Sequence, residues 1–179
     1  MNKPHILITG ERGIGKSTLV NRLLAHCTVP IYGYKTKNVS GEDGRSIGVY
    51  IYPANSTLFV NTEKNCAASP IGNEKTRMDV HLDVFNTLGV EYLKNAQPDG
   101  WIVMDELGYL ETKAMGFRSA VLERLDGDVP VLAVVRLNKD TDFLNQVRRH
   151  PKAELYTVTE ENRDLLYEVL KSRMEAARG

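Results

Sequence analysis

Residues 10–17 read Gly10-Glu11-Arg12-Gly13-Ile14-Gly15-Lys16-Ser17 and match G-x-x-x-x-G-K-[ST] at every fixed position. The apolar run 6–8 before them predicts a buried strand, and residues 18–24 after them place apolar side chains on one helical face. A glycine-rich loop between a strand and a helix directs backbone N–H groups and the positive end of the helix dipole at a polyphosphate. We therefore predict a phosphate-binding loop (P-loop) from Gly10 to Thr18. Lys16 would contact the β- and γ-phosphates, and the Ser17 hydroxyl would bind Mg²⁺.

The composition limits the class of protein. At 179 residues the chain has the length of one domain, which we take to span residues 1–179. Its 23 basic and 23 acidic side chains cancel, which argues against nucleic acid as the main partner. Cys27 and Cys66 belong to no C-x-x-C motif, so we expect reduced thiols in a cytoplasmic protein without structural zinc. No apolar stretch is long enough to span a bilayer. We also expect the protein to be a monomer.

Strand and helix patterns alternate along the rest of the chain. Segments 29–36 and 47–52, separated by the turn-rich residues 40–46, predict a β-hairpin. Residues 53–76 are irregular, with one brief strand expected at 57–60. Further strands are expected at 101–106, 129–135 and 153–158, and helices at 79–96, 112–125, 142–150 and from 159 onward. This alternation predicts an α/β domain with a mostly parallel sheet that binds ligands at the carboxyl ends of its strands.

An acidic pair ends one of these strands. Four apolar residues, 101–104, run directly into Asp105 and Glu106. Asp105 is predicted to hold Mg²⁺ opposite Ser17. Glu106 lies one residue further, where a carboxylate can orient and deprotonate the water that attacks the γ-phosphate. The alternative for Glu106 is a solvated charge at the start of a loop. Arg136 follows the strand at 129–135 and is predicted to reach the same edge of the sheet.

Two other functions use the same residues. Residues 105–108 also fit the D-x-x-G motif of switch GTPases, and Asn138-Lys139-Asp140-Thr141 approaches the guanine-binding N-K-x-D. Because the fourth position is Thr141, and that carboxylate must meet guanine from a fixed loop, we treat the second match as coincidence. A nucleotide or small-molecule kinase would use the same P-loop. It would also need an acceptor pocket and an arginine-bearing lid, for which Arg148-Arg149 is the candidate.

Several motifs, in this order, resemble the small P-loop nucleoside-triphosphatases of the cancer-related nucleoside-triphosphatase type. The resemblance covers most of the chain outside residues 53–76. It includes Ile8-Thr9-Gly10 leading into the loop, the hairpin from Tyr32, residues 103–111 around the acidic pair, and residues 157–164 with their Asn-Arg-Asp signature.

The resemblance implies a RecA-like three-layer α/β sandwich, with a β-hairpin beside a mostly parallel central sheet. It implies slow, Mg²⁺-dependent hydrolysis of ATP, GTP and other nucleoside triphosphates to diphosphate and phosphate, with weak base selectivity. We expect an arginine to compensate charge on the transferred phosphoryl group. Arg136 and Arg163 are the candidates, and the alternative for each is a surface or helix-capping ion pair.

Overall fold

A computed structural model describes residues 4–72, 77–138 and 140–176. Within them the strands form an eight-stranded sheet in the order β5-β4-β3-β2-β6-β7-β1-β8. The strands are β1 His5–Thr9, β2 Ile31–Ser40, β3 Ser46–Pro53, β4 Cys66–Pro70, β5 Met78–Val80, β6 Trp101–Leu107, β7 Val131–Val135 and β8 Ala153–Thr157. The α-helices are α1 Lys16–Ala25, α2 Leu82–Val84, α3 Val90–Lys94, α4 Met115–Asp126, α5 Asp142–Arg148 and α6 Arg163–Ala176. A π-helical segment, Phe85–Gly89, joins α2 to α3, and 3₁₀ turns cover Glu63–Asn65 and Leu110–Lys113.

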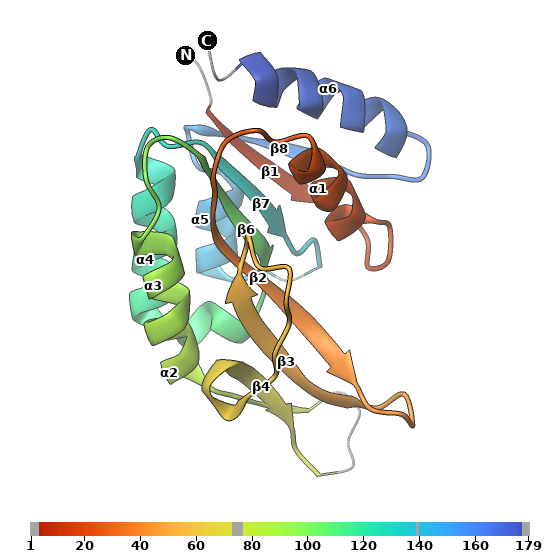
Figure 1. Cartoon of the computed structure of the whole chain (residues 1–179), viewed down its shortest axis with the longest axis vertical. Coiled ribbons are helices and arrows are strands. Elements are labelled where there is room, and N and C mark those ends of the chain that lie inside the picture. The colour runs from red at the N-terminus through yellow and green to blue at the C-terminus, as the bar shows by residue number, and fades with distance from the viewer. Residues whose placement is uncertain (1–3, 73–76, 139, 177–179) are drawn as a thin grey trace.

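The sheet has a parallel part and an antiparallel part. Strands β2, β6, β7, β1 and β8 pair in parallel, while β3, β4 and β5 continue the sheet beyond β2 as antiparallel strands. In Figure 1 the β2–β3 hairpin projects away from the parallel strands. The expected α/β fold, with a mostly parallel sheet and a β-hairpin, is therefore confirmed.

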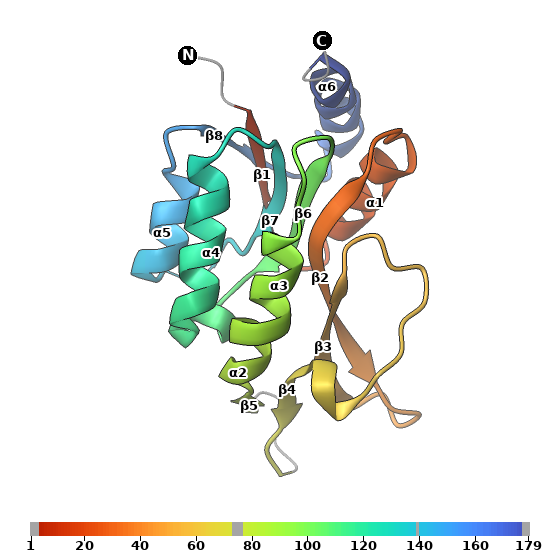
Figure 2. The same cartoon turned by 60° about the vertical axis from the view of Figure 1, so that its left-hand side comes forward.

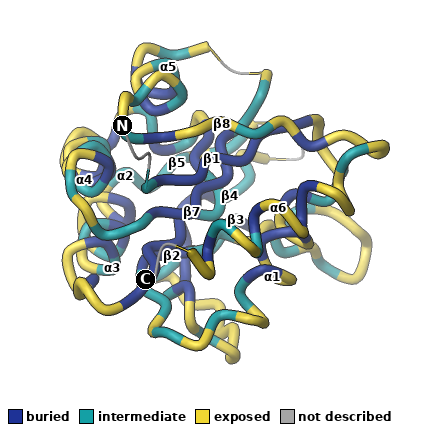
Figure 3. Tube along the Cα trace, turned by 90° about the horizontal axis from the view of Figure 1, so that it is seen from above, coloured by how far each residue is buried: buried dark blue, intermediate teal, exposed yellow. Residues whose placement is uncertain are grey.

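Helices cover both faces of the sheet and make three layers, as Figure 2 shows. Helices α3, α4 and α5 pack on one face through buried residues such as Leu93, Phe117 and Phe143. Helices α1 and α6 pack on the other through Leu19, Leu23, Leu166 and Leu170. In Figure 3 the central strands are buried and the outer faces of the helices are exposed. Among the described residues, no helix combines the length and apolarity needed to cross a membrane.

The turn from β1 into α1 depends on glycine. Gly15 precedes the first helical residue and has φ 101°, a left-handed conformation that disfavours other residues. At Gly10 a Cβ would lie 2.7 Å from the carbonyl oxygen of Val158, so only glycine fits beneath the loop after β8. These two glycines bring the amino end of α1 to the carboxyl edge of the sheet.

Two predictions for the middle of the chain were wrong. Residues 57–60 form no strand, and the pairing after the hairpin is made instead by β4. The helix expected over 79–96 begins at Leu82, because Val80 pairs with Ala68 of β4 in a short strand. Pairing between segments distant in sequence has overridden local periodicity here. Gly89 is explained by packing, since a Cβ there would lie 2.7 Å from the Phe117 ring.

Candidate nucleotide-binding site

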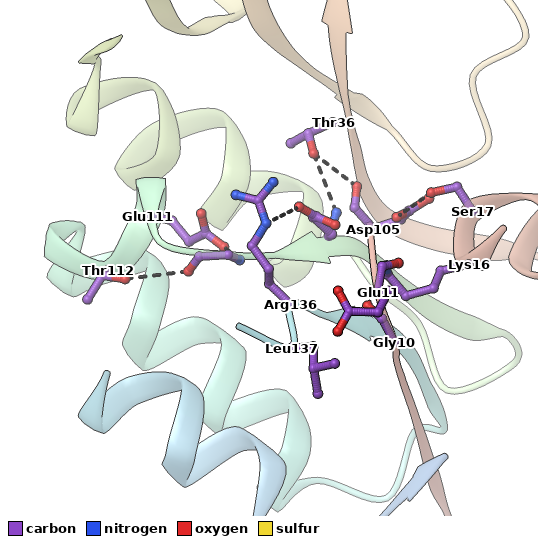
Figure 4. Close-up of polar contacts among 12 residues, drawn as sticks. Gly10, Glu11, Lys16, Ser17, Thr36, Asp105, Glu111, Thr112, Arg136 and Leu137 are labelled. Carbon is purple, nitrogen blue, oxygen red and sulfur yellow. Dashed lines mark hydrogen bonds and ion pairs between the residues drawn. The ribbon is translucent and has the colours of Figure 1, made fainter. Parts of the chain in front are cut away.

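A cavity opens at the carboxyl edge of the parallel strands, where the P-loop, the acidic pair and Arg136 meet. Its volume is about 800 Å³, within the usual range for small-molecule sites. Its lining includes Gly10, Lys16, Ser17, Asp105, Glu106 and Arg136, together with Arg12, Gly13, Gly15 and Thr18. Figure 4 shows Ser17 and Asp105 facing each other, with Arg136 between Asp105 and Glu111. The fold thus brings together three segments that are far apart in the sequence.

Lys16 bridges the P-loop from inside. It is the first residue of α1, and its Nζ donates hydrogen bonds to the carbonyl oxygens of Gly10 (2.8 Å) and Glu11 (2.7 Å). Only 9% of the residue is exposed. Burial lowers the pKa of this ammonium, and the nearby Glu106 carboxylate acts against that shift. A desolvated cation at the amino end of a helix favours an anionic ligand.

Ser17 and Asp105 form the second part of the site. The Ser17 hydroxyl donates to Asp105 Oδ1 at 3.2 Å, joining the start of α1 to β6. Burial raises the pKa of the Asp105 carboxyl to about 6, while the hydrogen bond from Ser17 lowers it. Both side chains offer oxygen atoms, the ligands that Mg²⁺ prefers. This donor pair therefore fits a magnesium ion.

Glu106 lies next to Asp105 and is paired with Arg136. Arg136 Nε is 3.4 Å from Glu106 Oε1, and the two side chains are 35% and 31% exposed. The register between β6 and β7 shifts between Asp105 and Leu107, and such bulges commonly re-aim a side chain beside a site. Thr36 of β2 fixes the local backbone through two hydrogen bonds. Its Oγ1 donates to the Asp105 carbonyl and accepts the N–H of Glu106, with 3.4 Å between N and Oγ1.

Two residues that support this site escaped the sequence analysis as functional positions, and a third was considered for a different role. Thr36 is one of them. Glu111 is buried beneath the acidic strand, where its Oε1 accepts the N–H of Gly108, and burial raises the pKa of its carboxyl to about 7. Arg148, considered above for a lid, instead donates from Nη2 to the carbonyls of Arg136 and Leu137. It therefore positions the segment that carries Arg136.

Not every predicted residue lines the cavity. Glu11 accepts a hydrogen bond at 3.1 Å from the amide of Asn138, and Ile14 packs against the apolar core beneath α1. Arg163 is exposed at the start of α6, outside the cavity lining. Asn138 does line the cavity, whereas Lys139 lies outside the described residues.

A P-loop leading into a helix, with an acidic strand end opposite its serine, defines a P-loop NTPase. Residues 5–170 match a family model described as NTPase, and the chain belongs to this family.

Relatives and a solved structure agree with this assignment. The chain is 30% identical over 178 residues to nucleoside-triphosphatase THEP1 of Methanocaldococcus jannaschii, covering 96% of this chain and 97% of that protein. It is 32% identical over 173 residues to nucleoside-triphosphatase THEP1 of Thermofilum pendens, covering 93% and 92%. The crystal structure of THEP1 from the hyperthermophile Aquifex aeolicus superposes with a TM-score of 0.74 at 26% identity, covering 93% of this chain and 96% of that one.

Proposed function

We propose that this protein is a Mg²⁺-dependent nucleoside-triphosphatase that converts ATP, GTP and other nucleoside triphosphates to diphosphate and phosphate. The observation that carries the proposal is a single cavity lined by the P-loop, the Ser17–Asp105 pair and the Glu106–Arg136 pair. These groups are the phosphate cradle, metal ligands, base and cation that phosphoryl transfer to water requires. The family membership and the names of the relatives support the same activity.

Each group has a role that follows from its position. The backbone N–H groups from Gly10 to Thr18 bind phosphate oxygens. Lys16 gives up its hydrogen bonds to the carbonyls of Gly10 and Glu11 and contacts the β- and γ-phosphates instead. Ser17 and Asp105 would hold magnesium, which supplies positive charge against the phosphates. Glu106 accepts a proton from the water that attacks the γ-phosphorus. The bond from the γ-phosphorus to the β–γ bridging oxygen then breaks, and the diphosphate leaves.

Arg136 and Arg163 remain the candidates for compensating charge on the transferred phosphoryl group. The cavity lining favours Arg136, whose guanidinium is already beside Glu106. Weak base selectivity is supported by the incomplete N-K-x-D motif, where Thr141 caps helix α5 by accepting the N–H of Leu144. A cap hydroxyl in that position provides no carboxylate for the guanine edge.

Phosphate release from ATP, GTP, CTP and UTP, each with and without Mg²⁺, tests the proposal. We expect release from all four with the metal and little without it. Strict guanine selectivity would favour a regulatory switch instead. Release that is indifferent to chelation of the metal would contradict the assignment of Ser17 and Asp105.

A further inference from the structure

The cavity continues past the acidic pair, away from the P-loop. Its lining includes Thr36 and Asn38 of β2, Ser46 and Val49 of β3, Met78 of β5, and Phe85 at the start of the π-helical segment. We call the part lined by Asn38, Ser46, Val49, Met78 and Phe85 the distal compartment. Figures 1 and 2 show that β3, β4 and α2 lie at this end of the sheet.

Strand geometry places the distal compartment directly beyond the reacting groups. Thr36 contacts the backbone of Asp105 and Glu106, so it marks the position of the acidic pair. Asn38 lies two residues further along β2 on the same face, about 7 Å away. Asn38 is opposite Val49 in the β2–β3 register, so the two side chains lie on one face of the sheet. A molecule in this compartment can therefore present an atom to Glu106 while its body lies along β2 and β3.

Of the described residues that line the distal compartment, Asn38 and Ser46 are polar and none carries a charge. The Ser46 hydroxyl donates to Asn38 Oδ1 at 2.5 Å. This contact fixes the orientation of the Asn38 amide and therefore of its N–H groups. Val49 and Met78, both partly exposed, add an apolar surface, whereas Phe85 is almost wholly buried against the Phe117 ring. Among described residues that line the whole cavity, the cations are Arg12 and Lys16 of the P-loop and Arg136, which is paired with Glu106. The distal compartment thus suits a neutral molecule with hydroxyl groups and one flat apolar part.

We propose that the distal compartment binds a nucleoside as a second substrate, and that the protein can transfer the γ-phosphoryl group to a ribose hydroxyl. The inference rests on the proposed triphosphate site. The hydroxyl oxygen forms a bond to the γ-phosphorus, the bond to the β–γ bridging oxygen breaks, and the hydroxyl proton passes to the Glu106 carboxylate. The products are a nucleoside monophosphate and the nucleoside diphosphate. Water gives hydrolysis when no acceptor is bound.

The test is transfer of label from Mg²⁺ and γ-³²P-labelled ATP, with adenosine, guanosine, cytidine, uridine or thymidine added singly. We expect labelled nucleoside monophosphate beside labelled phosphate for at least one nucleoside. Asn38→Trp fills the compartment with a residue that strands accept. It should lower the ratio of ester to free phosphate about tenfold or more, because the acceptor is excluded. Lys37→Trp, on the opposite face of β2, is the matched control and should preserve that ratio.

Each contrary result has a distinct meaning. Labelled phosphate without ester for every nucleoside overturns the acceptor site and leaves the hydrolase intact. Neither product would overturn the proposed function itself. An ester ratio unchanged in Asn38→Trp and in a second filling variant, Val49→Phe, overturns the location. In parallel reactions with nucleoside monophosphates as acceptors, transfer to these with none to nucleosides overturns the neutral character of the acceptor.

Discussion

Arg136 and Glu106 form an ion pair across the ends of β7 and β6, with Nε 3.4 Å from Oε1. The arginine backbone is held in turn by Arg148, and its guanidinium lies 5.5 Å from the centre of the Tyr109 ring. About a third of each paired side chain remains exposed, so the contact contributes little to stability. The ion pair matters because it keeps a carboxylate and a cation beside the cavity that the P-loop lines.

Glu106→Gln should separate binding from chemistry. Glutamine has nearly the same size and can still accept a hydrogen bond from Arg136, so Mg²⁺–ATP should bind with about the parental affinity. It cannot accept the proton of the attacking water, and loss of a general base typically costs about 10²–10⁴ in rate. Calorimetric binding beside single-turnover phosphate release measures both. A rate within about threefold of the parent, under 1 kcal/mol of barrier, would remove Glu106 as the base.

Arg136→Ala should lower kcat by about 10²-fold, the scale for losing one group that stabilises transition-state charge. Arg163→Ala provides the comparison, since this residue is exposed at the start of α6 and should change kcat far less. Steady-state kinetics of both variants, with thermal melts to confirm folding, decide between the two candidates. The reverse ranking would mean that α6 approaches the nucleotide after binding.

Ser17→Ala should raise the Mg²⁺ concentration needed for half-maximal turnover by about tenfold or more, because one oxygen ligand is lost. Thr18→Ala, one residue along α1, removes a hydroxyl of the same kind. It should affect nucleotide affinity rather than the metal midpoint. A magnesium titration of Ser17→Ala that overlays the parent would contradict the metal role.

The P-loop and the central strands could be predicted because their signals are local. A fixed motif specifies the loop, and the apolar runs at 101–104 and 131–135 reflect strands buried on both faces. Strand β5 could not be predicted, since it exists only through the pairing of Val80 with Ala68 of β4, which no local pattern encodes. The helical spacing of apolar residues wrongly predicted that the neighbouring helix covers Val80.

The core of the site was predictable and its supports were not. Gly10–Ser17 and Arg136 follow strands, and Asp105 lies near the carboxyl end of β6, so parallel topology alone brings them to one edge. Thr36 supports the acidic pair through the pairing of β2 with β6, which no local pattern encodes. Glu111 reads as an ordinary surface acid, and its burial depends on the 3₁₀ turn at Leu110–Lys113 folding it under Gly108.

Glu111→Gln should change how stability depends on pH. Burial raises the pKa of this carboxyl from 4.5 to about 7 in the folded state. Between these values the unfolded chain has lost a proton that the folded chain keeps, so the folded state loses stability as pH rises through this window. Each pKa unit corresponds to about 1.4 kcal/mol, so the shift from 4.5 to about 7 sets an upper limit of about 3.5 kcal/mol for the loss.

Glutamine stays neutral at every pH, and its carbonyl oxygen can still accept the Gly108 N–H. The free energy of unfolding of Glu111→Gln minus that of the parent should therefore increase from pH 4.5 to pH 7 and stay constant above it. Urea denaturation of both proteins at intervals across this range gives the difference, in which groups that titrate alike in the two proteins cancel. A difference independent of pH would mean that Glu111 titrates normally. A difference that decreases with pH would mean that the Gly108 N–H stabilises the carboxylate more than burial penalises it.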